Sequence, residues 1–253
     1  MKKISVVLPV LAPTPFLRAM TEFAIKTLRA HADNPFELVV VEAVHDWFDP
    51  ARFKSGNDEW TIEKYLNFTP PIGAVQEGNA ALDAATGDFI VYTGTDVIVP
   101  QGWDTELLSL FERPDCGVAA LSAFEPGWII GPREPLDLVV EGMFSPFMMF
   151  RKGERFDEAY QRVYIDSDLV MRIYERGLRA FRSCRKHVWH FGSVTNKHAG
   201  EAHARKETSA LALDEGLFYQ RWGKSPLAMF GMIRAGQWLY GHEHESLTGR
   251  RGG

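Results

Sequence analysis

Apolar residues along the chain form short continuous runs that alternate with longer segments of helical spacing. Residues 4–10 form an unbroken, largely β-branched run, which predicts a strand buried on both faces. Apolar side chains recur every three or four positions over residues 16–31 and predict an amphipathic helix, and the run at residues 36–41 predicts a second strand. Together these segments predict a βαβ unit with parallel strands and a right-handed crossover.

The clearest pattern lies at residues 73–96. A helix of small residues is predicted for residues 79–86 and ends at Gly87, and an apolar strand follows at residues 89–92. Asp96 lies just beyond the end of this strand, after Thr93, Gly94 and Thr95. The carboxyl ends of the strands are where an open α/β sheet binds its ligands, so a carboxylate at this position is a candidate for ligand or metal binding.

The remaining pattern predicts further strands and helices. Residues 45–72 read as a long functional loop with a short helix near 60–66, residues 124–141 as a loop or lid, and residues 193–207 as a polar, mobile segment. Helices are predicted near residues 105–111, 166–176, 209–222 and 226–240, and strands at 118–121, 142–150, 178–181 and 186–190. The sequence thus predicts one α/β domain with a Rossmann-like, mostly parallel sheet flanked by helices.

Composition and charge narrow the class of protein. The 253 residues include two cysteines, too few for a disulfide framework, and no apolar run reaches the roughly 20 residues of a membrane span. We therefore expect a cytoplasmic protein, with the amphipathic segment 226–240 as a possible peripheral membrane contact. Residues 1–171 carry a net charge of −12 and residues 172–253 a net charge of +7, so the basic end is suited to an anionic substrate.

The chain carries a series of motifs, in chain order, that begins with the strand-like segments 5–10 and 39–42 and continues with 73–96, 142–151 and 165–169. Together they resemble the nucleotide-binding and acceptor halves of family 2, GT-A-fold glycosyltransferases. The resemblance spans about residues 4–223, including a late Arg-Trp-Gly motif at 221–223. It implies a glycosyltransferase domain at residues 1–223, with a nucleotide-sugar half at 1–100 and an acceptor half at 101–223, followed by a helical tail at 224–253. The matching segments are 5–10, 39–42, 73–96, 142–151, 156–158, 165–169, 176–177 and 188–190.

The resemblance implies a nucleoside-diphosphate sugar as the donor and Mn²⁺ or Mg²⁺ as the cofactor. Asp96 and His190 would bind the metal, while Glu42, Asn79, Thr95 and Asp96 would contact the donor. This chain departs from the family pattern at two positions, where Gly94 and Ile165 replace customary acids.

The same resemblance implies an inverting mechanism with a carboxylate base at the start of the helix predicted for residues 166–176. Asp166 is the preferred base, and Asp168 is the alternative or the residue that orients the acceptor. Both residues are also good caps for that helix. The acceptor implied by the family is a glycan or a lipid-linked sugar.

Other functions remain open or are excluded by missing motifs. The segment after the first strand lacks the glycines of a nucleotidyltransferase, and the chain has no dinucleotide-binding, Walker A or nucleophile-elbow motif. A non-catalytic protein that binds a sugar nucleotide or a polyanion remains an alternative. So does a transferase that glycosylates modified nucleic acid, because residues 172–206 are basic.

Overall fold

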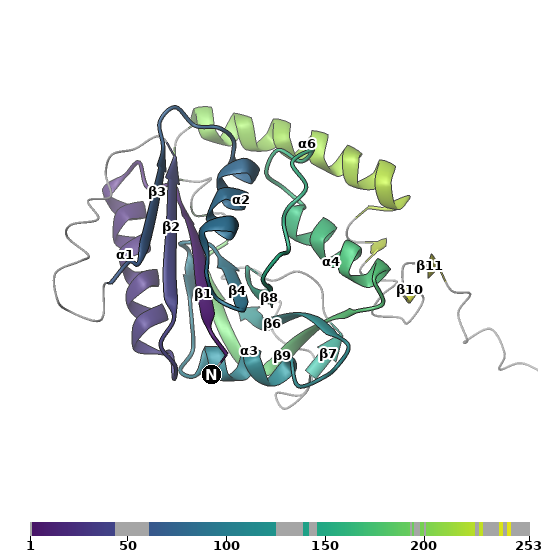
Figure 1. Ribbon diagram of the computed structural model, residues 1–253. Coiled ribbons are helices and arrows are strands. Elements are labelled where there is room, and N and C mark those ends of the chain that lie inside the picture. Colours follow the sequence, from purple (N-terminus) through teal and green to yellow (C-terminus); the bar gives the residue numbers. More distant parts are fainter. Residues whose placement is uncertain are drawn as a thin grey trace, which may run out of the picture.

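We describe the protein from a computed structural model (Figure 1). The description covers residues 2–43, 61–124, 139–141, 146–192, 194, 198–199, 201–225, 228–229, 238–239 and 242–243. The predicted lid at 124–141 therefore lies largely outside the described residues, as do residues 45–60 of the predicted loop at 45–72 and most of the C-terminal tail.

The main sheet of the described part of the chain has the order β3-β2-β1-β4-β8-β6-β9-β5, with β7 paired to β9, and a separate two-stranded sheet pairs β10 Trp238–Leu239 with β11 His242–Glu243. Neighbours among β3, β2, β1 and β4 are parallel, β8 is antiparallel to β4 and β6, and β9 is parallel to β6. The strands are β1 Ile4–Val10, β2 Glu37–Ala43, β3 Lys64–Phe68, β4 Phe89–Thr93, β5 Val97–Ile98, β6 Cys116–Phe124, β7 Val139–Glu141, β8 Phe147–Arg151 and β9 Arg179–His190.

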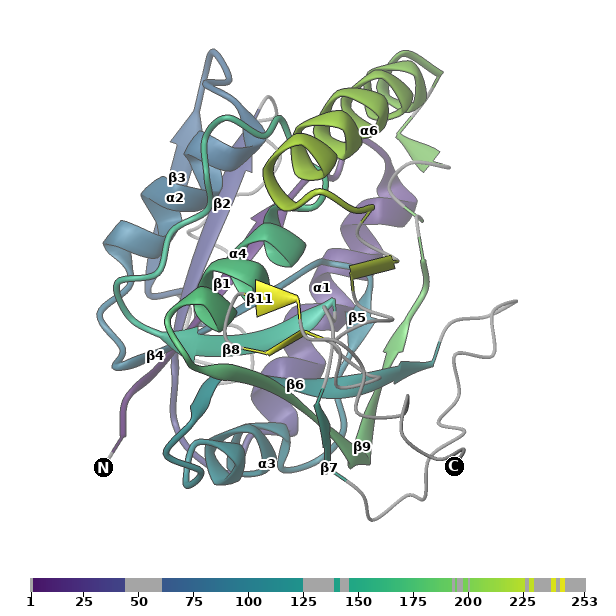
Figure 2. The same ribbon diagram turned by 90° about the vertical axis from the view of Figure 1, so that its right-hand side faces the viewer.

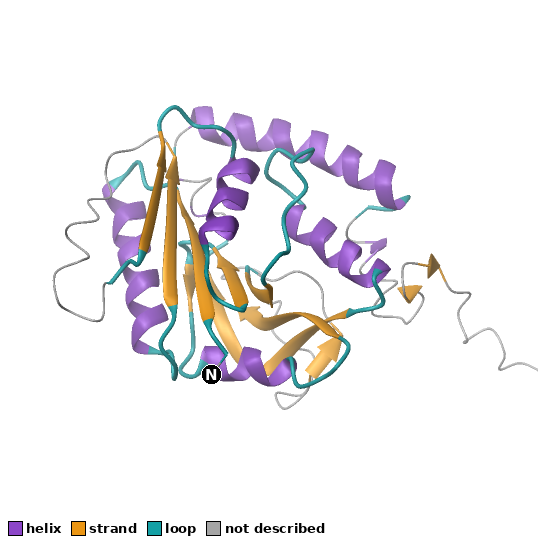
Figure 3. Ribbon diagram, viewed as in Figure 1, coloured by secondary structure: helices purple, strands orange, loops and turns teal. Residues whose placement is uncertain are grey.

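Helices cover both faces of this sheet, as Figure 3 shows. They are α1 Pro15–Ala30, α2 Ala74–Ala84, α3 Trp103–Leu110, α4 Ile165–Glu175 and α6 Glu201–Trp222. In Figure 1, α1 lies on one side of β1 and β2 and α2 on the other, while α6 spans the edge toward which these strands point.

Side chains along each strand point alternately to the two faces of the sheet, and this divides the hydrophobic core into two clusters, one on each face. Val6 and Leu8 pack with side chains of α1 and α3, whereas Val7 packs with side chains of α2, α4 and α6. Because successive side chains of a strand point to opposite faces, an uninterrupted apolar strand requires helices on both faces. The predicted α/β fold class, with helices flanking a Rossmann-like sheet, is confirmed.

The local sequence explains where α1 begins. Thr14 caps the helix by accepting a hydrogen bond at Oγ1 from the Leu17 backbone N–H at 3.3 Å, and Pro15 occupies the first turn. A proline fits there because the amide groups of the first turn have no partner inside the helix. The predicted unit of strand, helix and strand at residues 4–41 is confirmed.

Four local predictions were wrong. The helix near residues 60–66 is replaced by the edge strand β3, whose tyrosine and phenylalanine favour a strand beside β2. The two strands expected at 178–190 form one strand, β9, with an irregular register against β6. The last long helix begins at Glu201 rather than 209, and residues 238–239 pair with 242–243 as a β-ribbon instead of ending a helix.

Among the described residues, none of the helices combines the length and the apolar character needed to cross a bilayer.

Candidate functional site

Two residues far apart in the sequence meet where β4 leads into β5. Asp96 lies between these strands, and Val97 of β5 pairs with His190 at the end of β9. The Phe191 backbone N–H donates to the Asp96 carbonyl at 3.0 Å. This pairing places Nε2 of His190 3.5 Å from Oδ2 of Asp96, with 19% and 15% of the two side chains exposed.

The chemistry of this pair fits a divalent cation. In an octahedral site with bonds of about 2.1 Å, two adjacent ligand atoms lie about 3 Å apart. Nε2 of His190 and Oδ2 of Asp96 are 3.5 Å apart, so a small movement of the side chains would let both bind one ion. The described residues contain no group of three or more His, Cys, Asp or Glu side chains placed to hold a metal ion. A cation at this pair would therefore take further ligands from water and from phosphate oxygens, as Mg²⁺ commonly does.

Gly94 has a local reason to replace the customary acid. A Cβ atom at this position would lie 2.8 Å from Oδ1 of Asp96. The Asp96 side chain thus lies over the space that a larger residue at 94 would enter. Thr95, between them, is buried.

Glu42 lies near the end of β2 and is fully buried. Its Oε2 accepts a hydrogen bond of 2.5 Å from the hydroxyl of Tyr65 on the neighbouring strand β3. The structure thus confirms the position at a strand end, and it adds Tyr65 as a partner that the sequence did not indicate. Contact between Glu42 and the donor stays a prediction.

Asn79 is buried in α2 and braces the segment before α4. Its Oδ1 accepts from the Phe156 backbone N–H at 2.9 Å, and its Nδ2 donates to the Phe156 carbonyl and to Glu158 Oε1, both at 3.0 Å. Both ends of the amide are therefore engaged by the protein. This geometry favours a bracing role over the predicted contact with the donor.

We expect Asn79→Ala to lower the free energy of unfolding by about 2 kcal/mol, because it leaves the buried polar backbone groups of Phe156 without these partners. Urea unfolding followed by circular dichroism measures this change. Gln220→Ala, at an exposed position of α6, is the control and should change stability by less than about 0.5 kcal/mol. Equal stability of the two variants would contradict the bracing role.

Asp166 occupies the first turn of α4, two residues after Tyr164, which has φ 59°. Its Oδ1 accepts from the backbone N–H of Ser167 at 2.8 Å and from the Ser167 hydroxyl at 3.4 Å. Neither bond from Ser167 reaches Oδ2. Burial raises the pKa of Asp166 above the usual aspartate range, although the bonds from Ser167 oppose the shift. A carboxylate with a raised pKa suits a general base.

Tyr92, near the end of β4, is influenced by the charge of this carboxylate, which the sequence did not indicate. Burial raises the pKa of Tyr92, and the charges of Asp166 and Glu77 raise it further while Arg162 opposes them. All three charged groups are therefore close enough to act on the phenol. Tyr92 continues an apolar strand pattern, so its position along the chain does not indicate a polar role.

Asp168 differs sharply from Asp166, although only one residue separates them. It is fully buried, and its Oδ1 accepts from the Tyr160 hydroxyl at 3.2 Å, Arg221 Nη1 at 2.9 Å and Trp222 Nε1 at 3.1 Å. Its Oδ2 accepts from Arg172 Nε at 2.8 Å. Four donors on a buried carboxylate favour a structural role, so the geometry supports Asp166 rather than Asp168 as the base.

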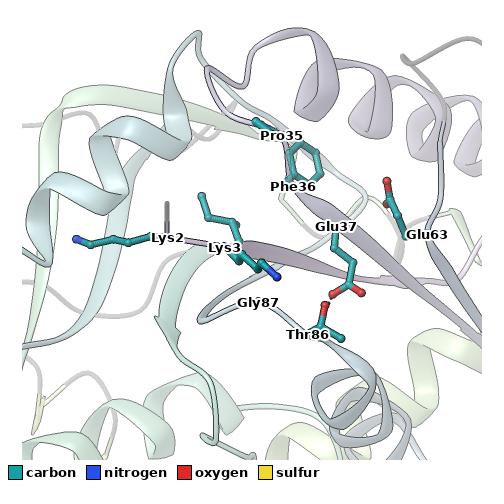
Figure 4. Close-up of a pocket in the computed structure, with 9 residues that line it drawn as sticks. Lys2, Lys3, Pro35, Phe36, Glu37, Glu63, Thr86 and Gly87 are labelled. Atoms are coloured by element: carbon teal, nitrogen blue, oxygen red, sulfur yellow. The ribbon is translucent and has the colours of Figure 1, made fainter.

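A separate open hollow of about 510 Å³ lies at the opposite edge of the sheet, beside the start of β1 (Figure 4). Glu37 and Glu63 line it, but they are already paired with Lys64 at 2.9 Å and Arg29 at 2.6 Å. Lys2 and Lys3 also line it. The hollow lies beside the first residues of β1 and before β4, whereas Asp96 follows the end of β4, so the two sites are separate.

Comparison with solved structures identifies the fold. TarS from S. aureus (residues 1–349) matches with a TM-score of 0.58 and 16% identity, over 76% of this chain and 61% of that one. The same protein in complex with UDP-GlcNAc matches with a TM-score of 0.56 and 18% identity, over 80% and 60%. The chain thus spans about three fifths of the length of these TarS structures.

The mannosyltransferase PcManGT from Pyrobaculum calidifontis, in complex with GDP-Man and Mn²⁺, matches with a TM-score of 0.64 and 19% identity. The match covers 92% of this chain and 68% of the mannosyltransferase. No family model matches the sequence, and no curated protein matches it significantly. The chain therefore has a fold similar to that of GT-A-type glycosyltransferases.

Proposed function

We propose that the protein is an inverting glycosyltransferase that transfers a hexosyl or pentosyl group from a nucleoside-diphosphate sugar to an acceptor hydroxyl. Asp96 and His190 would hold Mn²⁺ or Mg²⁺, and Asp166 would be the base. The observation that carries the proposal is the meeting of Asp96 and His190, 3.5 Å apart, within a glycosyltransferase fold.

The proposed reaction is a single displacement. The oxygen of the acceptor hydroxyl bonds to the anomeric carbon while Asp166 takes the proton from that hydroxyl. At the same time, the bond between the anomeric carbon and the diphosphate breaks. A divalent cation at Asp96 and His190 would neutralise the charge that develops on the departing diphosphate.

The solved neighbours guide the choice of donor. TarS binds UDP-GlcNAc and the mannosyltransferase binds GDP-Man with Mn²⁺, so uridine and guanosine diphosphate sugars are the first donors to test. We propose a glycan or a lipid-linked sugar as the acceptor. Residues 172–206 are basic, so a nucleic-acid acceptor is tested in parallel through the salt dependence of its binding.

We expect the protein to release UDP or GDP from at least one of these sugars in the presence of Mn²⁺, and to lose that activity in excess EDTA. A panel of donors assayed for nucleotide release measures the first step. With an acceptor present, proton NMR of the product should show inversion at the anomeric carbon. Retention of configuration would contradict the single-displacement mechanism. Turnover that excess EDTA does not lower would contradict the proposed need for a divalent cation.

A non-catalytic binding protein is the second candidate, favoured by one observation. The candidate metal site offers two protein ligands, and the family's first acid is Gly94 here. Calorimetry of the same donors with and without Mn²⁺ separates the two functions. Metal-dependent binding without any turnover would favour the binding protein.

A further inference from the structure

The loop that leads into α4 is held by a single buried carboxylate from α6. Asp214 is 1% exposed. Its Oδ1 accepts from the Gln161 backbone N–H at 2.9 Å, and its Oδ2 accepts from the backbone N–H groups of Arg162 at 2.9 Å and Val163 at 2.7 Å. One side chain thus fixes three consecutive peptide groups.

The C-terminal end of α6 makes further hydrogen bonds and ion pairs with the loop before α4 and with the first turn of α4. Arg221 donates to Asp168 at 2.9 Å and pairs with Asp157 at 2.6 Å, and Trp222 donates to Asp168 at 3.1 Å. Burial alone would lower the pKa of the Arg221 guanidinium. The carboxylates of Asp168 and Asp157 have a larger, opposite effect, so the pKa is raised above the usual arginine value. In both Figure 1 and Figure 2, α6 passes beside α4.

These contacts surround Asp166 without touching it. Val163 is three residues before Asp166, and Asp168 is two residues after it. Asp166 accepts hydrogen bonds from its neighbour Ser167. Its place in the site is therefore set by the backbone on either side, and α6 holds that backbone on both sides.

We propose that α6 is a clasp for residues 157–168 and that Asp214 is the positioning residue for the base Asp166. This inference deepens the proposed function and depends on it. Removing Asp214 would let the loop shift while Asp96 and His190 keep their pairing. A displacement of about 1 Å at a reacting group lowers rates by as much as about 100-fold.

The chain offers a closely matched control in Asp104. This carboxylate is also buried, and it accepts from the backbone N–H groups of Asp33 and Asn34, each at 2.9 Å, and from Asn34 Nδ2 at 2.8 Å. It lies at the opposite edge of the sheet, at the start of α3. Asp214→Asn and Asp104→Asn thus remove similar interactions at different distances from the site.

We expect Asp214→Asn to lower kcat more than tenfold with the KM for the donor within about twofold, and Asp104→Asn to leave kcat within about twofold. Both variants should lose similar thermal stability. Equal values of kcat in the two variants, or a loss in Asp214→Asn confined to the donor KM, would overturn the inference.

A second measurement does not depend on turnover. Burial raises the pKa of both Tyr92 and Tyr164, and the charge of Asp166 raises each further. Arg162 and Glu77 also act on Tyr92, and Glu215 also acts on Tyr164. Carboxyl ¹³C NMR of Asp166 should show a lower pKa in Asp214→Asn than in the wild type, because water enters the loosened loop. Hydrogen exchange should rise at residues 157–168 in Asp214→Asn and not in Asp104→Asn. An unchanged titration and unchanged exchange would overturn the clasp, whereas a wild type without turnover on any donor would count against the proposed function alone.

Discussion

Asp96→Ala is expected to lower kcat/KM for donor turnover by about 1,000-fold, a loss of roughly 4 kcal/mol of transition-state stabilisation. In the pair that Asp96 forms with His190, 3.5 Å away, the carboxylate is the only anionic ligand. Among the described residues, no third His, Cys, Asp or Glu side chain is placed to join this pair. Without the carboxylate, the imidazole alone cannot hold a hard cation that prefers oxygen ligands. The departing diphosphate would then carry its charge without compensation.

Asp88→Ala is the matched control for this prediction. Asp88 precedes the same strand, β4, at its other end, and its Oδ2 accepts from the Lys3 backbone N–H at 3.0 Å. This variant should keep kcat/KM within about twofold, because it removes an exposed aspartate far from the site. Calorimetry should show that Mn²⁺ strengthens UDP or GDP binding in the wild type and in Asp88→Ala, and not in Asp96→Ala. Mn²⁺-dependent turnover that survives in Asp96→Ala would remove the basis of the proposed metal site.

The sequence predicted the position of Asp96 because the signal is local. An apolar strand with a carboxylate three residues after its end places that group at the edge where parallel strands end. The approach of His190 has no such local signal. It depends on the pairing of the two-residue strand β5 with the end of β9, 91 residues later in the chain, which no periodicity reveals.

The distinction between Asp166 and Asp168 also lies beyond local pattern. Both acids fall in the first turn of one helix, and both suit its positive end. Only the arrival of Arg221 and Trp222 from α6 commits Asp168 to a buried network. The late Arg-Trp pair was noticed in the sequence, but its partner could not be identified without the fold.

Asn79 and the strand β3 illustrate the same limit. The amide of Asn79 suits either a ligand or a backbone partner, and tertiary contact with Phe156 engages it in the fold. The strand β3 follows a stretch whose sequence has no regular apolar spacing, and its place beside β2 outweighs the weak helical pattern of residues 60–66.

Asp166→Asn is expected to lower kcat by about 1,000-fold, within the range attributed to a positioned general base, and to leave the KM for the donor within about twofold. Asparagine keeps the size of the side chain and its bond from Ser167, but it cannot accept the proton of the acceptor hydroxyl. In the wild type, kcat should fall as the pH decreases through the pKa of Asp166, which burial raises above the usual aspartate range. The residual activity of Asp166→Asn should lack this acidic limb.

Stability separates loss of chemistry from loss of fold. The folded-state pKa of Asp166 is raised above its unfolded value, so its ionised form costs stability at pH values above the folded pKa. The neutral asparagine removes this cost, and Asp166→Asn should unfold at the same or a higher urea concentration than the wild type at pH 7. Asp168→Asn is the matched control, because it breaks a buried network of four donors and should lose about 3 kcal/mol.

The two variants together decide which carboxylate is the base. A stable Asp166→Asn protein with almost no turnover, beside a destabilised Asp168→Asn protein with measurable turnover at low temperature, is the outcome that the geometry predicts. The reverse pattern, in which Asp166→Asn keeps turnover and Asp168→Asn loses it, would make Asp168 the base. Asp168 could then reach the acceptor only after α6 moves away, because Arg221 and Trp222 of α6 donate hydrogen bonds to its carboxylate. In that case Asp214→Asn would be expected to raise turnover, which is the opposite of its effect if α6 must stay closed.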